Sequence, residues 1–428
     1  MSKLEFWNIY YNNSEVYLLI LVFVMLLSLF LARALKFSVY HPIIFYFFFN
    51  YQFALVGVIF LHYLEFIDND LANYFYFTEG IFLFGFMFSI FILNLAKKIS
   101  YNCKGSTTYS LIDKDFSKLG YETCTLIYFL SLIITYTSFG IPLFSESKWS
   151  VFASIPLAGV IGRLGASAYI LVIVYLSVKF IRNENFKRID KFNIMILLVS
   201  GLLSAKKMFF LDYFYIFFIT SYFLGYQISK KHTKKIIFYF TIISFFVLGT
   251  VYLNQLVMNG METNPFELII KRFAMSGDAQ ILSMPHMIID YLNAGEDLLS
   301  IIFYELKGLF SIAGVYLDGP SLGVKMMRLH HPYLESNIGP ASTFDVFYYV
   351  YFKDISYVLS LFTGIIIGFI SVYKPRISGE FELIFWVVII FNAYTLIYNP
   401  QVFVSNIIFN LMFLLLFWLF LKLGLRNE

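Results

Sequence analysis

The sequence predicts an all-α polytopic membrane protein with about eleven (10–12) transmembrane helices and one large extracytoplasmic loop that contains short helices. Three observations predict this fold class. Hydrophobic residues make up 60% of the 428 residues and charged residues only 14%, whereas soluble domains hold about 45–50% and 25%. Apolar runs of about 20 residues recur along the chain, and Lys and Arg gather on alternate connections between them. We therefore expect one transmembrane domain over residues 1–428, with the loop at 254–355 inside it.

The apolar runs are the predicted spans, of which the sixth is the shortest. The first run, Tyr17 to Leu35, is too long for the apolar region of a signal peptide, and Arg33 and Lys36 lie at its end rather than before it. We expect a retained helix whose N-terminus lies outside. The spans are predicted at residues 17–35, 43–63, 75–96, 123–139, 162–181, 192–205, 209–229, 235–253, 355–373, 381–398 and 402–423.

Positive residues assign the sides of the membrane, because cytoplasmic loops carry an excess of Lys and Arg. One side of the predicted topology holds most of them, and we predict that this side is the cytoplasm. Its positive residues are Arg33, Lys36, Lys97, Lys98, Lys104, Lys114, Lys118, Arg182, Lys187, Arg188, Lys191, Lys230, Lys231, Lys234, Lys235, Lys374, Arg376, Lys422 and Arg426.

The opposite face carries an acidic loop at Glu65, Asp68 and Asp70, and the stretch from about 254 to 355. A loop of roughly 100 residues is uncommon in a compact protein unless it is functional. Its apolar part, Leu298 to Leu317, predicts helices that lie in the membrane interface rather than cross it.

Several cations fall on the face that should lack them. Arg163 stands at the mouth of the fifth span, and Lys206 and Lys207 lie between the sixth and seventh. Arg272 and Arg328 belong to the long loop. Arg binds phosphate oxygens in a bidentate way and Lys adds a mobile charge, so these cations predict a lipid-linked pyrophosphate as the ligand. In the competing interpretation Arg163 only extends to the interface, and the lysines are cytoplasmic because the sixth run does not span.

A proton acceptor is predicted close to where the long loop re-enters the membrane. His330 and His331 are adjacent, with Glu335 four residues further on, and such groups exchange a proton near neutral pH when suitably placed. The alternative is that they are solvated loop residues, with one His capping a turn before Pro332.

Metal and cofactor patterns are weak, and we expect neither a metal nor a cofactor. The two His residues are not spaced to chelate along a helix. Asp68-Asn69-Asp70 has the DxD form of some metal-dependent glycosyltransferases, but such a tripeptide is common by chance. Glycine-rich phosphate loops and nucleotide fingerprints are absent from the sequence, so neither a soluble nucleotide substrate nor a nucleic acid partner is expected. The spans are almost free of charge, which disfavours transport.

The chain resembles the Wzy-type polymerases of O-antigen and capsule repeat units. The resemblance lies in the topology with one large late loop, in Gly140 to Phe144 followed by Gly162-Arg163, and in the run from Asn337 through Phe352 into a span with Gly364 and Gly368. It covers most of the chain, but its motifs have low specificity.

The resemblance implies a metal-independent, inverting glycosyltransferase of the GT-C type in the bacterial inner membrane, with its active site facing the periplasm. Such an enzyme moves a growing glycan from undecaprenyl pyrophosphate onto the sugar of an incoming lipid-linked repeat unit. Arg163, Arg272 and Arg328 are the positions that match external arginines of the family, and Lys206 and Lys207 stand where a relative has Arg before the seventh span.

The mechanism needs three roles. Glu335, His330 or His331 is expected to accept the proton of the acceptor hydroxyl, and the cations to stabilise the leaving pyrophosphate. The lipid tails would lie between spans and hold the reacting sugars together. Sugar contacts are expected from Tyr316, Tyr333, Tyr348 and Asp278. The expected partners are undecaprenyl-pyrophosphate-linked glycans and membrane lipid, with a chain-length regulator and a flippase as candidate protein partners.

Three other functions stay open on the sequence. An O-antigen ligase would use the same donor with a lipid A core acceptor, a transporter or flippase would relocate the lipid-linked glycan without lengthening it, and a non-catalytic scaffold would tolerate loss of Arg272 and Arg328.

Overall fold

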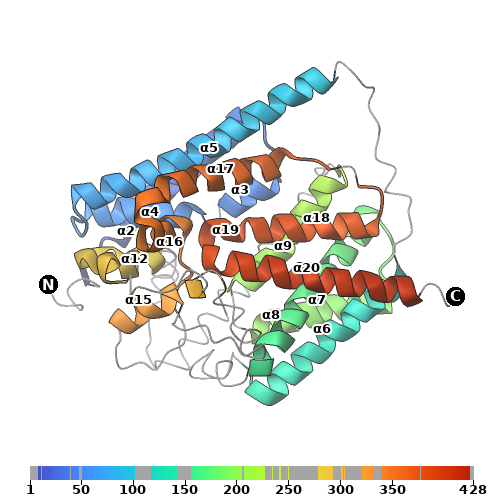
Figure 1. The fold of residues 1–428 in the computed structure, drawn as a ribbon. Helices are drawn as coiled ribbons and strands as arrows, with labels where there is room; N and C mark the ends of the chain where they lie inside the picture. The colour runs from blue at the N-terminus through green and yellow to red at the C-terminus, as the bar shows by residue number, and fades with distance from the viewer. Residues whose placement is uncertain are drawn as a thin grey trace. The chain divides into compact units, whose positions relative to one another are not determined.

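The computed structural model describes the helices shown in colour in Figure 1. Within the described residues every regular element is a helix, and no strand occurs. The fold class predicted from composition is therefore confirmed as all-α. The described residues are 8–10, 12–38, 40–47, 51–101, 117–141, 156–204, 207–226, 234, 241, 249, 278–292, 300–301, 303, 321–330, 339–375 and 377–424.

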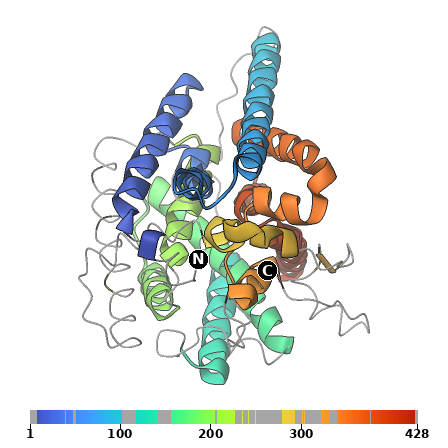
Figure 2. The same cartoon turned by 90° about the vertical axis from the view of Figure 1, so that its left-hand side faces the viewer.

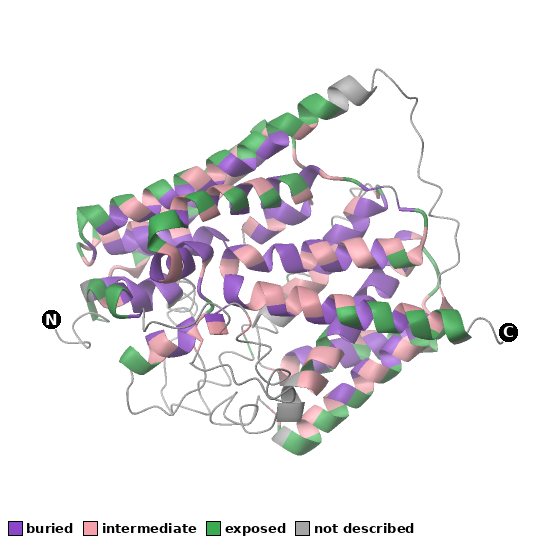
Figure 3. Ribbon diagram, viewed as in Figure 1, coloured by how far each residue is buried: buried purple, intermediate pink, exposed green. Residues whose placement is uncertain are grey.

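Seven helical stretches in the described part of the chain are long and apolar enough to cross a bilayer, at 14–34, 69–96, 118–138, 160–181, 344–372, 380–398 and 400–423. Exposed residues recur along α5 (Asn69–Tyr101) and α20 (Pro400–Gly424) (Figure 3). The exposed residues of these helices include large apolar side chains such as Phe84 and Leu416. Exposed Leu and Phe at such density suit lipid rather than water as the solvent. The chain is therefore a membrane protein with transmembrane helices.

The predicted count of about eleven spans is not confirmed among the described residues, in part for local reasons. The predicted span at 43–63 is divided into α3 (Pro42–Tyr46) and α4 (Gln52–Tyr63). The sixth and seventh are α8 (Arg188–Leu203) and α9 (Lys207–Phe223), of 16 and 17 residues. A helix of that length spans about 24–26 Å, less than the roughly 30 Å of a hydrocarbon core. The predicted span at 235–253 and most of the loop at 254–355 lie outside the described residues.

The chain divides into two compact units, each made of segments that are far apart in the sequence. Unit 1 comprises residues 1–106, 263–374 and 393–405, and unit 2 comprises residues 107–262, 375–392 and 406–428.

Unit 1 contains most of the short elements. Its helices are α2 (Ser14–Ala34), α3, α4, α5 (Asn69–Tyr101), α12 (Asp278–Ser283), η5 (Pro285–Tyr291), α15 (Leu322–His330), α16 (Phe344–Phe352), η7 (Lys353–Ile355), α17 (Ser356–Val372), α19 (Thr395–Tyr398) and the first turn of α20 (Pro400–Gly424). The N-terminus of α3 is capped by His41, whose Nδ1 accepts the N–H of Ile43 at 3.3 Å. Burial lowers the pKa of His41 to about 3, so the ring stays neutral and can accept this hydrogen bond.

The helices α5 and α17 form the main packing pair of unit 1 and lie side by side in Figures 1 and 2. Gly85 faces the carbonyl oxygen of Leu361, and a Cβ there would lie only 2.5 Å from it. On α17, Gly364 and Gly368 face the backbone of Phe82 and Phe86. Small residues let membrane helices approach closely, so the glycines explain why two helices so far apart in sequence pack backbone to backbone.

Unit 2 is built around α6 (Lys118–Phe139) and α7 (Pro156–Ile181), with α8, α9, most of α18 (Glu380–Ala393) and the rest of α20. Helix α7 is the most buried of the candidate spans. Its neighbour α6 approaches closely at Gly120, where a Cβ would lie 2.6 Å from the Tyr175 hydroxyl, and again where Ser131 meets Gly165. The central helix of the unit therefore packs through small residues as well.

Side-chain and backbone contacts within each unit give the relative directions of the helices. Along α5 and α17 the contacts advance together, from Gly85 beside Leu361 to Ser89 beside Gly368, so these helices are parallel. Along α6 and α7 they run in opposite order, so these helices are antiparallel. Both relations agree with the alternation of spans predicted from the positive residues.

Candidate functional site

Two clefts open at one end of unit 1, which we call the loop end. It is formed by the turn 64–68 between α4 and α5, by α12 and η5, and by η7 at the start of α17. The first cleft has a volume of about 420 Å³ and is lined by residues 64–68 and Leu71 on one side and by Met284 and Met287 on the other. The second, about 520 Å³, lies between residues 289–290 and residues 349–355, and we call it the tyrosine cleft. The segment from Met284 to Asp290 therefore contributes to both.

The tyrosine cleft holds a chain of polar contacts. The Tyr349 hydroxyl donates to Asp290 Oδ1 at 2.8 Å, and Lys353 Nζ donates to the Tyr349 hydroxyl at 3.0 Å. Lys353 Nζ also lies 3.9 Å from Asp290 Oδ1 and 4.5 Å from the centroid of the Tyr349 ring. Asp290 and Lys353 are partly exposed, whereas Tyr349 is buried against Tyr74 and Phe75 of α5. The three groups are thus fixed relative to one another and open to a ligand.

Two buried carboxyl groups lie deeper in unit 1. Glu79 on α5 accepts a hydrogen bond from the Tyr51 hydroxyl, and Asp345 on α16 is 3.3 Å from the amide nitrogen of Gln280 on α12. The two carboxyl groups interact electrostatically. Among the described residues, no Lys or Arg pairs with either carboxyl group. Burial of ionisable groups in membrane helices is costly, and such groups are therefore rare there.

A ladder of polar side chains runs along α7 and α20 in unit 2. Arg163 Nη1 donates to Asn406 Oδ1 at 3.3 Å, and one helical turn further the Ser167 hydroxyl donates to Asn410 Oδ1 at 2.5 Å. Asn410 in turn donates to Asn392 on α18 at 3.0 Å. The ladder holds the guanidinium of Arg163, which is half-buried, at the first turns of a membrane helix.

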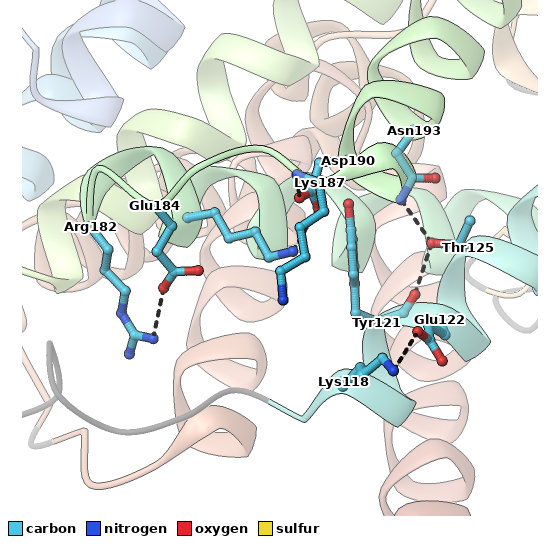
Figure 4. A network of polar contacts seen from close by, with 10 residues as sticks. Lys118, Tyr121, Glu122, Thr125, Arg182, Glu184, Lys187, Asp190 and Asn193 are labelled. Atoms are coloured by element: carbon cyan, nitrogen blue, oxygen red, sulfur yellow. Dashed lines mark hydrogen bonds and ion pairs between the residues drawn. The ribbon is translucent and has the colours of Figure 1, made fainter.

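Most other described charges of unit 2, with the exception of Asp212 on α9, lie in or beside the predicted cytoplasmic connections and include ion pairs (Figure 4). Lys179 Nζ is 2.6 Å from Oδ1 of the buried Asp190, and the N–H of Lys187 donates to Asp190 Oδ2 at 2.7 Å. Burial alone would raise the pKa of Asp190, but these hydrogen bonds outweigh it and hold the pKa below its usual value. The carboxylate stabilises the turn from α7 to α8.

Three of the predicted site residues have described side chains. Arg163 is on α7 in the ladder, and Arg328 is exposed on α15. Tyr348 is buried in α16, and its hydroxyl lies 2.7 Å from the Thr363 hydroxyl of α17. Its neighbour Tyr349, which was not predicted, is the one that lines a cleft.

The remaining predictions cannot be placed at the level of side chains. Lys207, Asp278 and His330 stand at the ends of α9, α12 and α15, and the structure describes only their backbone. The predicted site residues outside the described part of the chain are Lys206, Arg272, Tyr316, His331, Tyr333 and Glu335.

The DxD tripeptide has a structural role. Asp68 Oδ1 accepts the N–H of Leu71 at 2.8 Å and so caps the N-terminus of α5. Asn69 Oδ1 lies 3.0 Å from Nε2 of His62. Within the described residues, no group of three or more His, Cys, Asp or Glu is arranged to hold a metal ion.

Sequence reasoning missed Glu79, Asp345, Asp290, Tyr349 and Lys353. The one available signal was Glu79, a lone acid inside an aromatic span. The others come together only because η5, α16 and η7 meet at the loop end.

In comparisons with protein-family models, with curated proteins and with solved structures, nothing matches this chain.

Proposed function

We propose that this chain is a glycosyltransferase of the bacterial cytoplasmic membrane that polymerises undecaprenyl-pyrophosphate-linked oligosaccharide repeat units. It transfers the growing glycan, with inversion, to the incoming unit at the outer face of the membrane, and it releases undecaprenyl pyrophosphate. No metal takes part.

The observation that carries the proposal is the placement of Arg163. A guanidinium in the first turns of a membrane helix lies at the depth of lipid headgroups, and its hydrogen bond to Asn406 fixes its orientation. A preorganised cation at this depth suits charge that builds on a departing lipid pyrophosphate.

The reaction needs a base and further cations. The acceptor hydroxyl oxygen forms a bond to the anomeric carbon of the donor sugar, while the bond from that carbon to the pyrophosphate oxygen breaks. The hydroxyl proton passes to Glu335, His330 or His331. The negative charge on undecaprenyl pyrophosphate is stabilised by Arg163, Arg272, Arg328, Lys206 and Lys207.

The decisive experiment is polymerisation by the purified full chain, reconstituted with lipid-linked repeat units in EDTA. We expect a ladder of products for the wild type and a rate at least about 100-fold lower for Arg163→Ala, because one preorganised donor contributes on that scale. Lys118→Gln is the control, since Lys118 is an exposed surface cation of the same unit. An unchanged polymerisation rate in Arg163→Ala would exclude a role of Arg163 in stabilising the leaving pyrophosphate.

Deletion of the gene separates the polymerase from its nearest competitors. Loss of a polymerase leaves surface lipopolysaccharide with single repeat units, whereas loss of a ligase removes all attached O-antigen. A scaffold would leave chain length normal when Arg272 and Arg328 are replaced by Ala.

One observation favours a transporter instead, namely the buried pair Glu79 and Asp345. Buried carboxyl groups in membrane helices are typical of proton-coupled transport pathways. Reconstituted transporter would move lipid-linked repeat units across the bilayer without lengthening them.

A further inference from the structure

We propose that the tyrosine cleft is a carbohydrate-binding subsite that holds the glycan, and not the pyrophosphate, of the lipid-linked substrate. The identity of that glycan rests on the proposed function. The existence of a sugar site rests on the chemistry of the cleft itself.

The first argument is the combination of groups that line the cleft. Asp290 and Asp354 provide oxygens that accept hydrogen bonds from sugar hydroxyls, and the half-buried Tyr351 provides aromatic surface for the C–H face of a sugar ring. Two carboxylates against the single Lys353 make the lining acidic, which repels pyrophosphate. The volume, about 520 Å³, is within the ~300–1,000 Å³ of small-molecule sites.

The second argument is that the key carboxylate is fixed in advance. Asp290 Oδ1 accepts a hydrogen bond from the Tyr349 hydroxyl at 2.8 Å, and Lys353 Nζ lies 3.9 Å from the same oxygen. Tyr349 is itself locked by the rings of Tyr74 and Phe75, at 4.9 and 5.6 Å. A ligand therefore meets an acceptor whose orientation requires no ordering on binding.

The third argument is the place of the cleft on the membrane helix. Ile355, at the rim of the cleft, begins a stripe of exposed apolar side chains along α17 that continues at Val358, Phe362, Ile366 and Phe369. These positions recur at helical spacing and lie on one face. A sugar in the cleft would therefore stand directly above a lipid-facing surface suited to the polyprenyl chain to which it is attached.

The test measures glycan binding separately from polymerisation. The full chain in lipid nanodiscs is titrated with the oligosaccharide released by mild acid from lipid-linked intermediates of a deletion strain, and is applied to a panel of immobilised bacterial glycans. We expect the wild type to bind a glycan, and Asp290→Asn and Tyr349→Phe to raise the dissociation constant at least tenfold. Asp354→Asn, at an exposed position, is a further variant that cannot disturb the core.

Asp70→Asn is the matched control, because Asp70 is an exposed acid at the same end of unit 1 that lines neither cleft. In the polymerisation assay the cleft variants should raise KM with little change in kcat, in contrast to Arg163→Ala, which should lower kcat.

The outcomes distinguish the two proposals. A wild type that binds glycan but does not polymerise, with binding lost in Asp290→Asn, removes the proposed function and supports the cleft. Normal polymerisation with unchanged KM and glycan affinity in all three cleft variants overturns the cleft proposal alone. A wild type that binds no glycan overturns it too.

Discussion

Asp190 shows how one residue organises a turn of this protein. Its carboxylate is buried at the start of α8, where it receives both the Lys179 ammonium and the backbone N–H of Lys187. Because the pKa of Asp190 is held below its usual value, the folded state is favoured above that value and loses this contribution as pH falls through the folded-state pKa.

We therefore expect Asp190→Asn to lower the unfolding free energy at pH 7 by about 2 kcal/mol, the scale of a hydrogen bond to a charged group. Below about pH 4 the unfolding free energy of the variant should fall less steeply with decreasing pH than that of the wild type. Thermal denaturation in detergent over a pH series measures both effects. Glu184→Gln, which removes a partly exposed partner of Arg182, should change little, and an equal effect of the two variants would contradict the prediction.

Single residues also mark the limit of what the sequence could predict. The DxD tripeptide looked like a motif but is a helix cap, because Asp is favoured both as a metal ligand and as an N-cap. Asp290 and Lys353, 63 positions apart, become partners only through the meeting of η5 and η7. No periodicity in the sequence encodes that meeting.

At the scale of helices, the close pairing of α5 and α17 depends on Gly364. A Cβ at that position would meet the carbonyl oxygen of Phe82 and the backbone nitrogen of Phe86, which cannot move without displacing the helix. The Gly80 position, one helical face away on α5, has open space around its Cβ direction.

Gly364→Ala should therefore destabilise the protein by about 1–3 kcal/mol, the usual cost of overpacking. Gly80→Ala should be neutral or slightly stabilising, because Ala favours the helix. Unfolding in mixed micelles compares the two variants directly. Equal stability of both would show that the backbones of α5 and α17 do not approach closely at Gly364.

Helix existence was predictable and helix boundaries were less so. The long apolar runs predict α2, α5, α17 and α20 clearly, because a helix that crosses the hydrocarbon core needs about 20 consecutive apolar residues. The break between α3 and α4 was missed, since their residues form one continuous apolar run. The buried carboxyl group on α5 was missed for the same reason, because its neighbours are aromatic.

At the scale of the whole chain, topology is the prediction on which the functional proposal depends. In a background without Cys103 and Cys124, Asp70→Cys should react with a membrane-impermeant maleimide in intact spheroplasts, and Glu184→Cys only after permeabilisation. Both native residues are exposed. If Glu184→Cys reacts in intact spheroplasts, the assigned membrane orientation is wrong. The proposed sugar site would then face the cytoplasm.

The division into two units was not predictable from hydropathy. Residues 375–392 and 406–428 pack with 107–262, while 393–405 belong with the first unit, so the chain passes between units within its last 60 residues. Charge alternation fixes the direction of each helix but not its neighbours. Which helices pack together depends on small residues and on hydrogen bonds between helices, such as that of Ser167 with Asn410. These pairings cannot be read from the sequence.

The parallel pairing of α5 with α17 has a consequence for biosynthesis. About 250 residues separate the end of one helix from the start of the other, so at 5–20 residues per second α5 waits roughly 10–50 s in the membrane for its partner. During that interval the face of α5 that carries Gly85 has no α17 to pack against, and Glu79 has no α16 beside it. A ribosome that stalls before residue 356 would leave α5 inserted beside α4 but without its main packing partner.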